Sequence, residues 1–108
     1  MLTVDDINRR RHACLRCCGS FKIAGPLTAS LRRKLAVMLD EGQLVLAIRT
    51  IREETGAGLV EAKATYQHLT LAAGKCHWCR SQIPAEDYID CPACRALNID
   101  VRSTRRDV

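Results

Sequence analysis

Apolar residues recur at helical spacing through the middle of the chain. The first run begins after Pro26, and its apolar members share one face of an amphipathic helix: Leu27, Leu31, Leu35, Met38 and Leu39. The basic triplet within this run falls largely on the opposite face: Arg32, Arg33 and Lys34. We therefore expect a helix that ends at Gly42.

Two shorter helical runs follow. One is expected over about 43–55, with this apolar stripe: Leu44, Ile48 and Ile51. The other is expected over about 59–73, stopped by Gly74, with this stripe: Leu59, Ala62, Tyr66 and Leu69. Because the Gly-Ala-Gly connection at 56–58 is very short, the two helices must pack directly. The pattern predicts a small three-helix unit.

The start of the chain favours another helix, which is strongly basic. Thr3 is a capping residue, and the acids Asp5 and Asp6 follow in the first turn. The helix is expected over about 4–17 and carries four arginines: Arg9, Arg10, Arg11 and Arg16. Residues 19–26 contain glycine and proline, so we expect a linker there.

Four cysteines in the last third of the chain have the spacing of a metal site. They form a C-x2-C pair, an eleven-residue spacer and a second C-x2-C pair: Cys76, Cys79, Cys91 and Cys94. Each turn directs two sulfurs at one centre, and two turns supply the thiolates of a closed structural zinc site. Arg80 and Arg95 follow the turns and offset the charge of about −2 that four thiolates leave around Zn²⁺. Two disulfides or a thiol–disulfide pair are the alternatives.

A second group of potential ligands lies in the expected N-terminal helix: His12, Cys14, Cys17 and Cys18. One interpretation is a second metal half-site, completed within this group or by another chain. Another is that small, soft cysteines line the buried side of the helix. A third is redox chemistry, because nearby arginines lower the pKa of a thiol.

Composition indicates a small core and reduced thiols. Hydrophobic residues make up 47% of the 108 residues but aromatic residues only 4%. We therefore expect a small aliphatic core and a bound metal that supplies much of the order. The polar N-terminal segment lacks the apolar stretch of an export signal, and no apolar run approaches the ~18 residues that span a bilayer. We expect a cytoplasmic protein without a membrane partner.

The net charge of +5 is unevenly distributed along the chain. Residues 1–40 hold eight Lys/Arg and three Asp/Glu, a difference of +5 that accounts for the whole excess. This segment predicts contact with an acidic partner, or non-specific and salt-sensitive contact with nucleic acid. The loop between the cysteine pairs is acidic and repels phosphate, so nucleic acid would bind the basic residues within 9–34.

One stretch resembles a known family. Residues 47–63 read Ala-Ile-Arg-Thr-Ile-Arg-Glu-Glu-Thr-Gly-Ala-Gly-Leu-Val-Glu-Ala-Lys. This is similar to the helix–loop–helix in the C-terminal domain of the bacterial ribosomal stalk protein, large-subunit protein seven/twelve, over about residues 41–69. The Thr-Gly-Ala-Gly portion is also similar to the ubiquitin-associated-like N-terminal domain of elongation factor Ts. The Glu-Ala-Lys at 61–63 favours the stalk family.

The resemblance implies a binding face. In the stalk family, basic residues on these two helices contact acidic faces of translation factors, and by motif position the matching residues are Arg49, Arg52 and Lys63. The alternative is a solvated helix face, whose i, i+4 pairs contribute only ~0.2–0.5 kcal/mol each. Trp78, inside the first cysteine pair, either is an exposed contact residue or folds back over the helices.

The sequence thus predicts a mainly α fold, a small helical bundle that contains a stalk-like hairpin and is followed by a short β zinc ribbon. The expected divisions are a basic helix and linker (1–25), a stalk-like helical module (26–74), a zinc ribbon with a strand near its end (75–101) and a disordered tail (102–108). The expected function is a zinc-binding adaptor for a protein with an acidic face, a translation factor or the ribosome by resemblance. A nucleic-acid-associated regulator and a thiol-based redox or metal sensor are the alternatives. An enzyme is not expected, because a closed thiolate site leaves no position for substrate.

Overall fold

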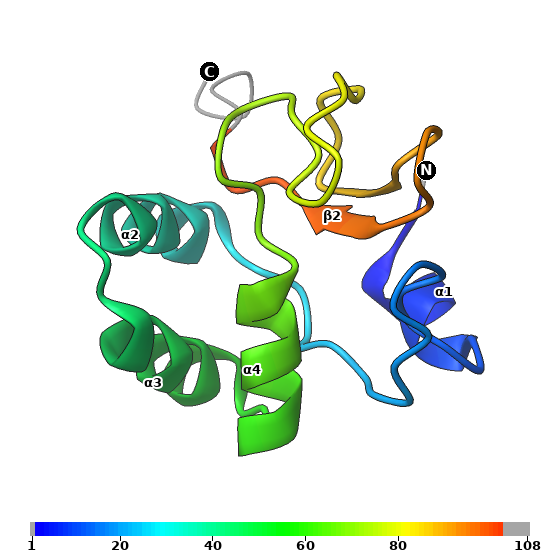
Figure 1. The fold of residues 1–108 in the computed structure, drawn as a ribbon. Coiled ribbons are helices and arrows are strands. Elements are labelled where there is room, and N and C mark those ends of the chain that lie inside the picture. The colour runs from blue at the N-terminus through cyan, green and yellow to red at the C-terminus, as the bar shows by residue number, and fades with distance from the viewer. Residues whose placement is uncertain (1, 103–108) are drawn as a thin grey trace.

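The structure, a computed structural model, describes residues 2–102. Within that range it contains four helices and one two-stranded antiparallel sheet: α1 (Val4–Arg9), α2 (Ala29–Asp40), α3 (Leu44–Thr55), α4 (Leu59–Gln67), β1 (Tyr88–Asp90) and β2 (Leu97–Ile99). Figure 1 shows α2, α3 and α4 grouped together, with α1 on the other side of the molecule near the sheet. The prediction of a mainly α fold with a short β segment is confirmed at this level.

Local signals mark the start and end of α2 and the end of α3. Thr28 caps α2, because its hydroxyl accepts a hydrogen bond from the N–H of Leu31. Gly42 follows α2 with a φ of 68°. Gly56 ends α3 with a φ of 75°, and its N–H donates to the carbonyl oxygen of Arg52. The glycine stops expected for these two helices are confirmed, because glycine enters this left-handed region without steric cost.

Two residues of the expected apolar stripes are exposed. Leu44 and Leu59 are 48% and 45% exposed, and each is the first residue of its helix, outside the part that neighbouring helices cover. The buried face of α3 is instead formed by Ala47, Thr50 and Ile51. The helical period was therefore correct, but its apolar stripe does not extend to the helix starts.

One basic residue of α2 is buried. Arg32 is 5% exposed, and its guanidinium donates to the carbonyl oxygen of Asp100 and lies 3.3 Å from a carboxylate oxygen of Asp87. The guanidinium carbon is also 6.0 Å from the centre of the Tyr88 ring. Placing Arg32 on the face opposite the apolar stripe was therefore wrong for this residue, because the segment around β1 and β2 covers it. Lys34 is exposed and pairs with Glu54 at 2.7 Å.

The last helix ends well before Gly74, at Gln67. After α4 the chain joins β2, because the N–H of Ile99 donates to the carbonyl oxygen of His68 at 2.8 Å, and the N–H of Thr70 donates to that of Ile99 at 3.0 Å. These sheet-type hydrogen bonds replace the helical ones, and the expected helix over 59–73 is wrong in its second half.

The N-terminal helix is also shorter than expected. α1 starts at a capping box formed by Thr3 and Asp6, as the sequence indicates, but ends at Arg9. Arg10 is extended, and its guanidinium donates to both carboxylate oxygens of Asp90, at 3.0 and 2.7 Å. This long-range pair draws the backbone out of the helix. Residues 11–18 form turns instead.

The sheet is short and its strands pair in simple register. Tyr88 lies opposite Ile99, and Asp90 lies opposite Leu97. The strand expected near 98–101 thus overlaps β2.

The end of the described chain is anchored. The Nε of Arg102 donates to the carbonyl oxygen of Thr70 at 3.2 Å, and its guanidinium lies 2.7 Å from the Asp40 carboxylate. The expected disordered tail therefore does not include Arg102, and its remainder, 103–108, lies outside the described residues.

A hydrophobic cluster runs through helices and sheet alike. It includes Ile7 from α1, Leu35 from α2, Ile51 from α3 and Ile99 from β2, all of them fully buried. A smaller cluster at the cysteine turns consists of four buried residues: Cys76, Ile83, Cys91 and Ala96. The helices and the strands therefore share buried apolar surface.

The burial of Arg32 predicts an unequal effect of two substitutions on one helix. Arg32→Ala should lower the free energy of unfolding by about 3 kcal/mol, because it leaves buried acceptors without their charged donor. Lys34→Ala removes the same charge from an exposed pair and should cost less than about 0.5 kcal/mol. Urea denaturation followed by circular dichroism measures both. Equal losses would contradict the buried role of Arg32.

Candidate metal centre

The four cysteines of the C-terminal segment meet at one point. The sulfurs of Cys76, Cys79, Cys91 and Cys94 all lie within 4.8 Å of one another. The Sγ atoms of Cys76 and Cys94 are 3.6 Å apart, as are those of Cys79 and Cys91. In a tetrahedral centre with metal–sulfur bonds of about 2.3 Å, neighbouring sulfurs lie about 3.8 Å apart. The four cysteines are therefore positioned to bind a metal ion.

The same distances test the disulfide alternative. A disulfide requires an S–S distance of about 2.05 Å. All four cysteines are free, and the two closest measured pairs join opposite turns at nearly twice that distance. The arrangement fits four thiolates around an ion rather than two disulfides.

Each cysteine pair lies in a tight turn with the same backbone hydrogen bond. The N–H of Arg80 donates to the carbonyl oxygen of Cys76 at 3.1 Å, and the N–H of Arg95 donates to that of Cys91 at 2.8 Å. Both arginines have positive φ, 67° and 70°. The turn places the residue after each pair in the left-handed region, where non-glycine residues are uncommon.

Hydrogen bonds from N–H groups to the sulfurs stabilise the thiolate form of the cysteines in both turns. The Sγ of Cys76 accepts from the N–H of Trp78 at 3.3 Å and from the side-chain amide of Asn98 at 3.4 Å. The Sγ of Cys91 accepts from the N–H of Ala93 at 3.4 Å. Asn98 is fully buried and also accepts from the N–H of His77 at 2.8 Å. Sequence reasoning missed Asn98, whose place behind the site no cysteine spacing indicates.

The thiols of the cluster differ in acidity. The neighbouring Ser81 hydroxyl and N–H lower the pKa of Cys79 to about 6. Burial and the adjoining thiols of the cluster raise the pKa of Cys94 to about 12. The metal-free cluster thus retains protons at neutral pH, and a metal ion must displace them when it binds.

Burial and ligand number limit the chemistry of this centre. Cys76 and Cys91 are buried, whereas Cys79 and Cys94 are partly exposed. Four protein ligands fill a tetrahedral coordination sphere and leave no position for water or substrate. The arrangement suits a structural ion.

The residues expected to bind a partner lie at the surface. Arg49, Arg52 and Lys63 are all exposed. Arg49 and Arg52 line a shallow hollow of about 260 Å³, together with Glu53 and Ala57. Lys63 lies on α4 and is not among the residues that line this hollow.

Trp78 is also at the surface. Its side chain is 53% exposed, and the Arg16 guanidinium lies 5.2 Å from the centre of the indole ring. Trp78 therefore does not fold back over the helices, and a cation–π contact covers part of its ring.

Two of the four potential ligands in the N-terminal segment lie close to His68, which the sequence analysis did not identify. Cys14 and Cys17 lie within 4.8 Å of His68 at the end of α4, and this cluster does not contain His12 or Cys18. Burial raises the pKa of Cys14, but hydrogen bonds from His68 and from backbone N–H groups outweigh it and lower that pKa to about 6. The interpretation that these cysteines line the buried side of a helix is wrong, because residues 11–18 are not helical.

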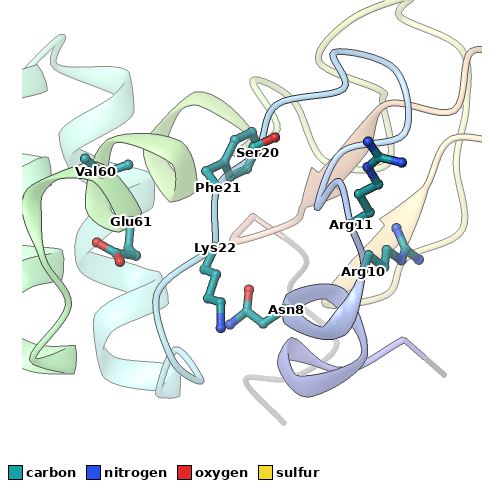
Figure 2. A pocket seen from close by; sticks show the side chains of 8 residues that line it. All are labelled: Asn8, Arg10, Arg11, Ser20, Phe21, Lys22, Val60 and Glu61. Carbon is teal, nitrogen blue, oxygen red and sulfur yellow. The ribbon is translucent and has the colours of Figure 1, made fainter.

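At least three of the eight cations in residues 1–40 form ion pairs within the molecule. Arg10 binds Asp90, Arg32 is buried, and Lys34 pairs with Glu54. A hollow of about 410 Å³ separates this segment from α4 and is lined in part by Arg10, Arg11 and Lys22 (Figure 2). Figure 2 shows the two guanidinium groups directed away from Lys22. These charges therefore do not converge on one anion.

In the described chain, no helix combines the length and apolar character needed to cross a lipid bilayer. Comparisons with protein families, with curated proteins and with solved structures found no match for this chain.

Proposed function

We propose that this protein is a small zinc-containing adaptor that binds an acidic protein surface through the exposed face of α3. Zinc is the proposed ion because four thiolates at tetrahedral spacing suit a soft or borderline cation with no geometric preference of its own. Iron is the other ion that a tetrahedral four-sulfur site accepts. The role of the ion is structural.

The observation that carries the binding proposal is the composition of the outer face of α3. Val45, Arg49 and Arg52 follow one another at i, i+4 and i+7, so they share one helix face. Val45 is 76% exposed, and both arginines line the same hollow. The opposite face of α3 packs into the core through Ala47 and Ile51.

A face that combines cations with exposed apolar side chains suits a protein partner. Arginine is enriched at protein interfaces, because its guanidinium binds carboxylates while its stem covers apolar surface. Leu44 and Leu59, the first residues of α3 and α4, are further apolar side chains at the surface, at 48% and 45% exposure. Nucleic acid has less support, because the N-terminal cations that it would need are partly engaged with Asp90, Asp87 and Asp100.

The partner class follows from the resemblance to the stalk family. The residues that carry it form a hairpin of α3 and α4 joined at Gly56, and its three basic positions are exposed. In the stalk family this hairpin contacts acidic faces of translation factors. We therefore propose a translation factor in the cytoplasm as the partner, with Arg49, Arg52 and Lys63 as the contact residues and Trp78 as an additional one.

Metal analysis tests the four-cysteine centre. Cys91→Ser should reduce the metal content by one ion per chain relative to the unmodified protein, because three thiolates and a hydroxyl hold Zn²⁺ far less tightly. Elemental analysis of protein purified under reducing conditions identifies and counts the ion. An unchanged metal content would refute the assignment of these ligands, and iron in place of zinc would refute the proposed ion.

A pair of double variants with equal charge change tests the binding face. Arg49→Glu with Arg52→Glu should weaken partner binding at least tenfold, because it replaces attraction to acidic groups by repulsion. Arg9→Glu with Lys22→Glu makes the same change in net charge on the basic N-terminal segment and should leave binding within about twofold. Nuclease-treated capture from lysate, with identification of the proteins retained, is followed by titration against a purified translational GTPase.

The two double variants distinguish protein binding through α3 from nucleic-acid binding by the basic N-terminal segment. The adaptor proposal requires an acidic translation factor that survives nuclease, binds the control variant and is lost with the α3 variant. Loss of all captured material with nuclease, or with the N-terminal variant alone, would instead assign the function to nucleic-acid binding by the basic segment.

A further inference from the structure

We propose that Cys14, Cys17 and His68 form a second metal site, distinct from the four-cysteine centre and independent of the proposed adaptor function. The ligand atoms of these three residues lie within 4.8 Å of one another. Two thiolates and an imidazole suit Zn²⁺, which accepts both ligand types in tetrahedral geometry.

The backbone at Cys14 repeats the turn found twice in the four-cysteine centre. The N–H of Cys18 donates to the carbonyl oxygen of Cys14 at 3.0 Å, the same bond that Arg80 and Arg95 make to the first cysteine of their turns. Cys18 also has a positive φ of 52°. Among residues 2–102, the non-glycine residues with positive φ are these three, and each directly follows a C-x2-C pair. The chain therefore contains three cysteine turns of one kind.

Hydrogen bonds to the sulfur of Cys14 extend the likeness. Its Sγ accepts from the N–H of Cys17 and from the N–H of Leu97, both at 3.4 Å. Cys14 is 1% exposed, so these donors face a buried sulfur. N–H groups directed at a sulfur stabilise its thiolate form, which is the form that binds metal.

His68 presents the correct nitrogen to the cysteines. One ring nitrogen, Nδ1, lies 2.7 Å from the carbonyl oxygen of Ala64, so this nitrogen carries the proton. The other, Nε2, is the nitrogen that would bind a metal ion when it carries no proton, and it lies 3.7 Å from the Sγ of Cys17. With metal–sulfur and metal–nitrogen bonds of about 2.3 and 2.05 Å, a tetrahedral ion places these two atoms about 3.6 Å apart. The observed distance therefore fits an ion between them.

The proposed ion would attach a long segment without helix or strand to the end of α4. Residues 10–28 contain neither helix nor strand, yet Ala13, Ile23 and Ala24 within them are buried. Ordered loops of this length are uncommon without a specific fixing element. An ion held by Cys14, Cys17 and His68 ties this segment to the end of α4.

The coordination of the second site differs from that of the first. Three protein ligands leave a fourth position, and the exposure of Cys17 places the site at the surface, where water fills that position. The neighbouring Cys18 is not part of the set, because its Sγ lies 3.6 Å from the carbonyl oxygen of Leu15. The second site is therefore an open three-ligand site.

Metal counting with two neighbouring cysteine variants tests the site. The unmodified protein, reconstituted with Zn²⁺ under reducing conditions, should bind two ions per chain, one in each ligand group. Cys17→Ser should bind one, and Cys18→Ser, the matched control, should bind two. Cys17 and Cys18 are both exposed, so neither substitution disturbs the core. Native mass spectrometry counts the ions in each variant.

Cobalt substitution supplies an independent signal. The Co²⁺ form of the unmodified protein should show the visible bands of two tetrahedral ions. Cys17→Ser keeps every ligand of the four-cysteine centre and should lose the bands of the ion with few sulfur ligands, whereas Cys18→Ser should keep them. One ion per chain in the unmodified protein, or equal stoichiometry for Cys17→Ser and Cys18→Ser, would overturn the proposal and leave Cys14 and His68 as a metal-free thiol–imidazole pair. Neither result depends on partner binding, so failure here leaves the adaptor proposal unaffected.

Discussion

A tetrahedral ion requires its four sulfur ligands about 3.8 Å apart, and this spacing constrains the C-terminal third of the molecule. Of the two turns that supply the sulfurs, one precedes β1 and the other joins β1 to β2, and each strand is only three residues long. Such a sheet is not stable by itself in water, since an isolated two-stranded hairpin is marginal even when longer. β2 is nevertheless fully buried and pairs with the segment after α4. An ion held by the four cysteines would thus fix a strand on which the helical core depends.

Ion pairs join the helical part to the same segment. Arg10 after α1 binds Asp90 on β1, and Arg32 on α2 lies against Asp87 and the carbonyl oxygen of Asp100. The excess positive charge of the first forty residues therefore has part of its counter-charge inside the molecule, in the acidic loop between the cysteine turns. An uneven charge distribution along a sequence indicates an external partner only after such internal pairs are subtracted.

The sequence predicted those features that neighbouring residues determine. The C-x2-C spacing, the helix cap at Thr3 and the glycines that end α2 and α3 are local signals, and all have the expected structure. The features it did not predict depend on distant contacts. Arg32 is buried by residues more than fifty positions away, and His68 meets Cys17 across 51 positions. Helical periodicity over 59–73 could not indicate that β2 would take the backbone hydrogen bonds after His68.

The positions of the cysteine turns leave the surface of α3 free of metal ligands. The turns and His68 involve the N-terminal segment, the end of α4 and the residues around β1 and β2, whereas α3 contributes no ligand to either group. Figure 1 shows α3 on the side of the molecule away from β2. Ions bound at these two groups would therefore affect α3 through the packing of α2 and α4, both of which α3 contacts directly. Under the proposed adaptor function, ions at these sites would stabilise the conformation of such a surface without taking part in its contacts.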